Sequence, residues 1–113
     1  RRRRPPGGEP AEEVKGAPAR DLEEVRRLVL DRLAGRQARV FLFGSWARGE
    51  ARRYSDIDVA ILAAEPLPAG FLLDLQETLE ASQVLYPVDL VDLTEAPAVL
   101  RERVLAEGQP WND

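Results

Sequence analysis

Residues 38–63 read ARVFLFGSWARGEARRYSDIDVAILA, and this stretch decides the fold because it contains two apolar runs with a polar segment between them. The first run, residues 38–43, is rich in β-branched and aromatic side chains and stops at Gly44, as expected for a mostly buried strand. The second run, residues 56–63, alternates around Ile57, Val59 and Ile61 and predicts a second strand. Residues 45–51 between them are typical of a short turn of helix.

Two chemical features flank these strands at a fixed distance. Gly44-Ser45 follows the first strand, where small side chains, backbone N–H groups and a hydroxyl can contact a phosphate. After ten intervening residues come Asp56 and Asp58, whose one-residue spacing on a strand places both carboxylates on one face, with Cα atoms about 6 to 7 Å apart. A Gly-Ser alone is usually a turn, and two such aspartates alone are usually a solvated face. Their coupling indicates a combined phosphate and metal site.

The rest of the chain alternates between helical and extended patterns. Apolar periodicity predicts helices over residues 18–34 and 71–79, and residues 87–93 predict a third strand. Asp21 can cap or charge the first turn of the first helix, and Thr94 can cap a last helix near the C-terminus. This order of elements predicts an α/β fold, with a small mixed β-sheet backed by helices on one side.

The composition divides the chain into a tail and one domain. Residues 1–17 are rich in Arg, Pro and Gly and are expected to be disordered, whereas residues 18–113 are expected to form a single small domain. The net charge is −4, and Arg1 to Arg4 contribute +4, so the remaining residues carry −8. Such an acidic domain argues against direct nucleic-acid binding.

Several kinds of chemistry are excluded by residues that the chain lacks. The sequence contains neither Cys nor His, which excludes thiol nucleophiles, imidazole bases and ordinary zinc sites. Carboxylates, hydroxyls, arginines and a hard cation remain. No apolar run reaches the length of a membrane span and no signal segment is visible, so we expect a cytoplasmic protein.

A third carboxylate can complete the site if the third strand lies beside the second. Asp89 is the better candidate, but Asp92 competes with it, because the register of the strand decides which of them faces the other carboxylates. Magnesium prefers oxygen ligands and is commonly held by carboxylates, substrate phosphates and water. Two magnesium ions, or manganese in their place, held by Asp56, Asp58 and Asp89 would suit nucleotidyl transfer.

The predicted roles follow from these side chains. Asp56 and Asp58 are expected to hold the ions, and Asp89 to hold the catalytic ion and take the proton of the acceptor hydroxyl. Gly44 and Ser45 are expected to bind the triphosphate. Arg48 can neutralise the same phosphates, although an ion pair with a surface acid is a close alternative.

The residues that carry this reasoning also resemble a known family. The run from Gly44 to Ala51, followed by Ser55-Asp56-Ile57-Asp58-Val59, resembles nucleotidyltransferases of the polymerase-beta superfamily, and the short chain resembles their minimal nucleotidyltransferase branch. The segment Val88-Asp89-Leu90-Val91-Asp92-Leu93 is similar to the strand that bears the third carboxylate of the family. The resemblance runs from about Leu22 to Trp111.

The resemblance implies a polymerase-beta-like fold and a magnesium-dependent transfer of a nucleoside monophosphate from an NTP, with AMP from ATP as the expected case. For the minimal branch it also implies pairing with a small helical HEPN protein, an RNase toxin that the nucleotidyltransferase neutralises, in some cases by adenylylating a tyrosine. The chain can form a homo-oligomer or a hetero-oligomer with such a partner.

Several alternatives stay open from the sequence alone. The chain can be an active enzyme, a non-catalytic antitoxin that neutralises a basic RNase by binding, or a small-molecule nucleotidyltransferase of the antibiotic-modifying kind. Trp46 can stack on a base or pack on the sheet, and Trp111 can anchor the C-terminal tail or a partner. For Arg52 and Arg53 a surface role is favoured over phosphate contact.

Overall fold

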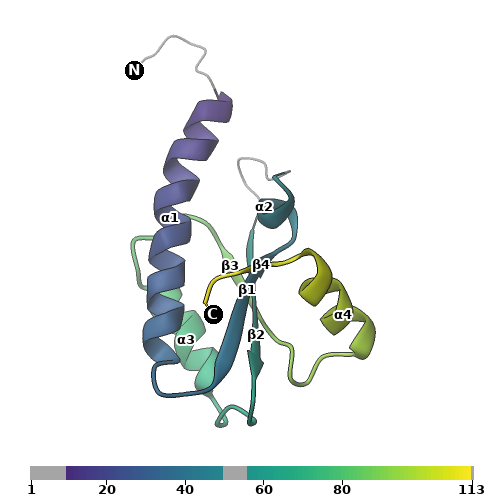
Figure 1. The fold of residues 1–113 in the computed structure, drawn as a ribbon. Helices are drawn as coiled ribbons and strands as arrows, with labels where there is room; N and C mark the ends of the chain where they lie inside the picture. Colours follow the sequence, from purple (N-terminus) through teal and green to yellow (C-terminus); the bar gives the residue numbers. More distant parts are fainter. Residues whose placement is uncertain (1–9, 50–55, 113) are drawn as a thin grey trace.

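The computed structural model describes residues 10–49 and 56–112, in which four helices and four strands alternate (Figure 1). Their bounds along the chain are α1 Pro10–Arg32, β1 Ala38–Phe43, α2 Ser45–Arg48, β2 Ile57–Ala63, α3 Phe71–Glu80, β3 Val88–Asp92, α4 Ala98–Glu107 and β4 Gln109–Pro110. The two central strands are therefore the two apolar runs predicted from residues 38–63.

The strands form one mixed sheet in the order β3-β2-β1-β4. β1 and β2 are antiparallel, and their register runs from Ala38 opposite Ala63 to Phe43 opposite Asp58. β3 lies beside β2 and runs parallel to it. The predicted small mixed sheet is confirmed, and so is the condition that the third strand lies next to the second.

Helices cover both faces of this sheet, so the expectation of helices on one side is wrong. Helices α1 and α3 pack through residues such as Val29 and Leu75 on the face that contains Val59. Helix α4 packs through Val104 on the opposite face, against Phe41. In Figure 1 α4 accordingly stands apart from α1 and α3 across the sheet. Successive side chains of a strand point to opposite faces of the sheet. Because β1 and β2 are apolar at consecutive positions, they present apolar side chains on both faces, and both faces must be covered.

Two predicted helix caps have other roles. Helix α1 begins at Pro10, eight residues before the expected start, so Asp21 lies in its middle. The Asp21 side chain is buried and accepts a hydrogen bond of 3.1 Å from the backbone N–H of Leu85. Helix α4 begins at Ala98, and the Thr94 hydroxyl accepts a bond of 3.1 Å from the N–H of Ala63 instead of capping it. Both side chains therefore connect segments that are distant in sequence.

The C-terminal segment adds a strand that the sequence patterns do not predict. Gln109 and Pro110 pair with β1, and the N–H of Trp111 donates to the carbonyl of Val40 at 2.7 Å. The Asn112 side chain accepts a bond from Val40 N at 2.9 Å and donates to the Ala38 carbonyl at 2.8 Å. Trp111 is half-buried and packs on the core, so of its two interpretations the structure shows an anchor for the tail.

No helix in the described part of the chain has the length and apolar character needed to cross a membrane.

Candidate functional site

The Gly44-Ser45 turn lies where the central strand β1 ends. Gly44 has φ 76° and ψ −154°, a backbone conformation that is essentially restricted to glycine. Ser45 is half-buried and begins α2, a single helical turn that is followed by Gly49 in the left-handed conformation. The chain thus reverses sharply at the end of β1, as the glycine after the apolar run predicts.

Gly44 lies directly against the carboxylate of Asp58. A Cβ atom placed on Gly44 would lie only 3.1 Å from Cγ and 3.4 Å from Cβ of Asp58, and it would overlap with Oδ2. The register that sets Phe43 opposite Asp58 accounts for this contact, because Gly44 is the next residue along the chain. The two halves of the sequence motif are therefore in contact in the folded protein.

Strand register then selects the neighbouring acid. Asp89 of β3 lies directly opposite Asp58 of β2, on strands spaced about 4.8 Å apart. Asp92 lies three residues further along and opposite Ile61, so its side chain points to the other face of the sheet. The Asp92 carboxylate accepts a bond of 2.9 Å from the N–H of Thr94 and stabilises the turn after β3. Asp89, rather than Asp92, is thus the neighbour of Asp58.

Asp56 lies one residue before β2 and is exposed, whereas Asp58 is half-buried and Asp89 is exposed. Among residues 10–49 and 56–112, no three acidic side chains lie close enough together to hold a metal ion. Two unit charges about 5 Å apart repel by roughly 3 kcal/mol at an effective dielectric constant of 20, so convergence of three carboxylates would be costly. The donor set still fits magnesium, because this ion is commonly held by only one or two carboxylates, completed by substrate phosphates and water.

Side chains from outside α2 help to hold this turn beside the carboxylates. The Trp46 ring meets the Tyr86 ring edge to face, with centroids 5.5 Å apart and planes at 86°. Both rings also pack against the apolar core on the Val59 face of the sheet. Of the two interpretations of Trp46, this packing is the one that the structure shows. On the other side of α2, the Gln109 side chain donates a bond of 3.1 Å to the Ala47 carbonyl. The sequence reasoning missed Tyr86 and Gln109, and an aromatic residue directly before a predicted strand was the available signal for Tyr86.

Some predicted residues cannot be placed. The backbone of Arg48 forms the end of α2, but its side chain lies outside what the structure describes. Arg52, Arg53 and Ser55 lie outside the described residues altogether. The assignment of Arg48 to phosphate therefore stays a prediction.

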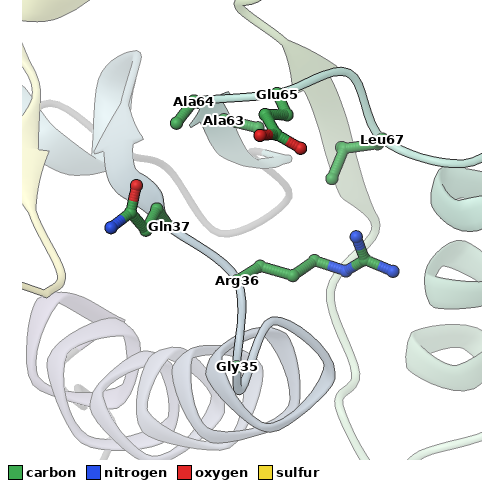
Figure 2. A pocket seen from close by; sticks show the side chains of 7 residues that line it. All are labelled: Gly35, Arg36, Gln37, Ala63, Ala64, Glu65 and Leu67. Atoms are coloured by element: carbon green, nitrogen blue, oxygen red, sulfur yellow. The ribbon is translucent and has the colours of Figure 1, made fainter.

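A cavity of about 260 Å³ lies at the opposite end of the central strands (Figure 2). It is lined by Gly35, Arg36, Gln37, Ala63, Ala64, Glu65 and Leu67. Ala63 is the last residue of β2, whereas Asp58 is near the start of that strand. This cavity is therefore separate from the carboxylates.

Comparison with known sequences identifies the family. Residues 36–110 match the model of the family described as polymerase beta, nucleotidyltransferase. The chain is 44% identical over 73 residues to the protein adenylyltransferase MntA of Shewanella oneidensis, a match that covers 64% of this chain and 52% of that protein. It is 38% identical over 63 residues to a Haemophilus influenzae protein named probable protein adenylyltransferase MntA, covering 56% of this chain and 55% of that protein. The chain thus spans about half the length of the curated relatives that it matches.

Solved structures give the same result. A toxin–antitoxin structure with AMP-PNP superposes with a TM-score of 0.68 at 37% identity, over 80% of this chain and 71% of that one. A structure of a tri-AMPylated Shewanella oneidensis HEPN toxin in complex with its MNT antitoxin superposes with a TM-score of 0.63 at 32% identity, over 83% of this chain and 71% of that one. The family model covers well over half of the sequence. The Gly-Ser pair follows the end of β1, and the acidic pair lies at the start of β2. This chain belongs to the polymerase beta nucleotidyltransferase family.

Proposed function

We propose that this domain transfers AMP from ATP to a hydroxyl group on a partner protein, and that the partner is a HEPN-type toxin which the transfer neutralises. The observation that carries the proposal is the contact between Gly44 and the Asp58 carboxylate, with Asp89 in register beside it. A turn suited to phosphate and a pair of acids suited to a divalent cation are thereby adjacent. Nucleotidyl transfer would use this adjacency, because a cation held by the carboxylates would neutralise charge on phosphates bound at the neighbouring turn.

The relatives support the class of donor and acceptor. Two of them are named as protein adenylyltransferases, and one solved neighbour is a toxin–antitoxin structure with AMP-PNP. Another contains an AMPylated HEPN toxin. Since this chain spans about half of the curated relatives, its acceptor and partner are part of the proposal. We assign the reaction to the cytoplasm, where ATP is available.

The proposed roles of the residues follow from their positions. The backbone N–H groups of Gly44 and Ser45 bind the triphosphate, and glycine permits a close approach of the backbone. Asp58 and Asp89 would hold magnesium or manganese together with the substrate phosphates, and we assign Asp56, one residue before β2, as a further ligand when two ions bind. When bound there, these cations would neutralise charge on the phosphates and favour ionisation of the acceptor hydroxyl. Asp89 takes the hydroxyl proton, the new bond forms between that oxygen and the α-phosphorus, and pyrophosphate leaves.

Labelled ATP, magnesium and the purified toxin test this function directly. We expect label on the toxin with the wild-type domain. Asp58→Asn and Asp89→Asn should each lower the rate by about a hundredfold or more, since each removes several kcal/mol of charge stabilisation. Asp92→Asn is the matched control, because Asp92 faces the other side of the sheet and should leave the rate almost unchanged. Absence of label on any protein, with an intact fold, would contradict the proposal.

Thermal unfolding tests the metal assignment without a turnover measurement. Magnesium or manganese with ATP should raise the Tm, because a ligand that binds only the folded state stabilises it. The double variant Asp56→Asn with Asp58→Asn should lose most of this gain. If the double variant keeps the same Tm shift, these two residues do not hold the cation.

A second candidate function is neutralisation by binding alone. The charge of −8 outside the first four residues would favour association with a basic RNase without any transfer. The triple Asp56→Asn, Asp58→Asn, Asp89→Asn variant separates the two functions. Full neutralisation by this variant would favour binding, whereas loss of neutralisation with retained complex formation would favour catalysis.

A further inference from the structure

The turn that carries Ser45 cannot maintain its own position. Helix α2 contains four residues, and an isolated helix of that length is unstable because nucleation is costly. Glycines with positive φ lie on both sides of it, Gly44 at 76° and Gly49 at 73°. Glycine restricts the backbone less than any other residue. The orientation of α2 must therefore come from tertiary contacts.

One of these contacts comes from the β3 edge of the sheet. The Trp46 ring packs edge to face on Tyr86, which lies two residues before β3. Such an aromatic pair contributes beyond its buried area. It holds one side of α2.

The second contact comes from the opposite edge. The Nε2 group of Gln109, in β4, donates to the carbonyl oxygen of Ala47 at 3.1 Å. Carbonyl groups in the last turn of a helix have no partner within the helix, so they are free to accept a bond from a side chain such as Gln109. Since β3 and β4 are the two edge strands of the order β3-β2-β1-β4, α2 is held from both edges.

The backbone of Gln109 is itself firmly placed. Gln109 pairs with Leu42 of β1, the strand that leads into α2. The preceding Gly108 donates its N–H to the Val104 carbonyl at 2.7 Å. A Cβ atom on Gly108 would lie 2.7 Å from that oxygen and 3.2 Å from Cβ of Phe41, so this segment is closely packed. The Gln109 side chain therefore extends to α2 from a backbone position that is fixed by strand pairing and close packing.

We infer that Gln109 is a positioning residue for the phosphate-binding turn, and that β4 thereby sets the affinity of the site for ATP. The inference rests on the proposed function of Gly44 and Ser45. In this role Gln109 acts through the Ala47 carbonyl. Binding groups that are held in place before the ligand arrives bind it more tightly, because less freedom is lost on binding.

The substitution Gln109→Leu removes the donor while keeping a similar volume at an exposed position. We expect the KM for ATP to rise about threefold to tenfold, as for the loss of one hydrogen bond, with kcat unchanged and the Tm only slightly lower. Hydrogen–deuterium exchange should become faster at the amides of residues 45–49 and stay unchanged in β2. Gln37→Leu is the matched control, since Gln37 is also exposed but lies at the other end of β1. It should change neither the KM for ATP nor the exchange of residues 45–49.

The outcomes distinguish this inference from the proposed function. If the wild-type protein neither binds nor uses ATP, the proposed function fails. If the wild type uses ATP and Gln109→Leu has the same KM and the same exchange at residues 45–49, only the positioning role fails. A rise in KM accompanied by faster exchange throughout the sheet would also overturn it, because the effect would then be a general loss of stability.

Discussion

Gly44 shows most directly how one residue joins the two halves of the site. Its backbone conformation is essentially restricted to glycine, and its missing side chain leaves room for the Asp58 carboxylate. Either reason alone would favour glycine. The positive φ is a conformational requirement, and the room for Asp58 is a requirement of the site. The two can be tested apart, because another glycine of the chain has a positive φ but no close neighbour.

That glycine is Gly35, which has φ 87° and no atom within 4 Å of an added Cβ. We predict that Gly44→Ala and Gly35→Ala both lower the free energy of unfolding, by about 1 to 3 kcal/mol, because alanine is strained at positive φ. Only Gly44→Ala should also abolish ATP-dependent transfer, since its methyl group displaces Asp58. Denaturant unfolding and the labelling assay measure the two effects. Equal transfer by both variants would show that the Asp58 contact is unimportant.

At the scale of elements, the fold depends on polar side chains that bridge distant segments. Asp21 of α1 holds the segment before β3 through the N–H of Leu85, next to Tyr86, which contacts α2. Because Asp21 is only 8% exposed, its lost contacts with water must be replaced by this bond. Helix α1 therefore contributes more than an apolar face to the sheet.

We predict that Asp21→Ala lowers the free energy of unfolding by about 1 to 3 kcal/mol, because the N–H of Leu85 loses its partner. Asp31→Ala is the control on the same helix, since Asp31 is exposed and lies 3.5 Å from Arg27. The hydrogen bond and charge of Glu24 are the main reasons that the pKa of Arg27 is raised, so its principal partner remains in this variant. Denaturant unfolding should show a clear shift only for Asp21→Ala, and equal shifts would contradict the bridging role.

At the scale of the whole molecule, the C-terminal segment completes the edge of the sheet beside β1. The Asn112 side chain bonds both the N–H of Val40 and the carbonyl of Ala38, as a further strand residue would. The carbonyl of Trp111 accepts a bond of 3.0 Å from Arg26 Nε, which ties the same segment to α1. The segment thus connects the sheet, the first helix and, through Gln109, the α2 turn.

We predict that Asn112→Ala costs about 1 to 3 kcal/mol of unfolding free energy, since two backbone groups of β1 lose their partner. The exchange of the Val40 amide should become faster in this variant. Gln37→Ala, an exposed amide side chain one residue before β1, should have little effect on either quantity. If the Val40 amide is equally protected in both variants, the edge does not depend on Asn112.

Much of the fold follows from local sequence patterns. The runs of residues 38–43 and 56–63 predict the central strands, of which β2 begins one residue later than expected, and the apolar period of residues 71–79 predicts α3. These features depend on side chains that are close in sequence, so periodicity reveals them. The same patterns failed for Asp21 and Thr94, because a polar residue near an expected helix start resembles a cap when its true partner is distant in sequence.

The candidate site likewise depends partly on local sequence and partly on tertiary structure. The sequence by itself determined which chemistry we propose, since Gly44-Ser45 and Asp56-Ile57-Asp58 in a chain without Cys or His leave carboxylates and a hard cation as the available means. Only the tertiary structure decided that Asp89 rather than Asp92 adjoins Asp58, that helices cover both faces, and that Gln109 reaches α2. The physical reason is that strand pairing joins residues far apart along the chain, and a shift of one residue in register would turn every side chain to the other face.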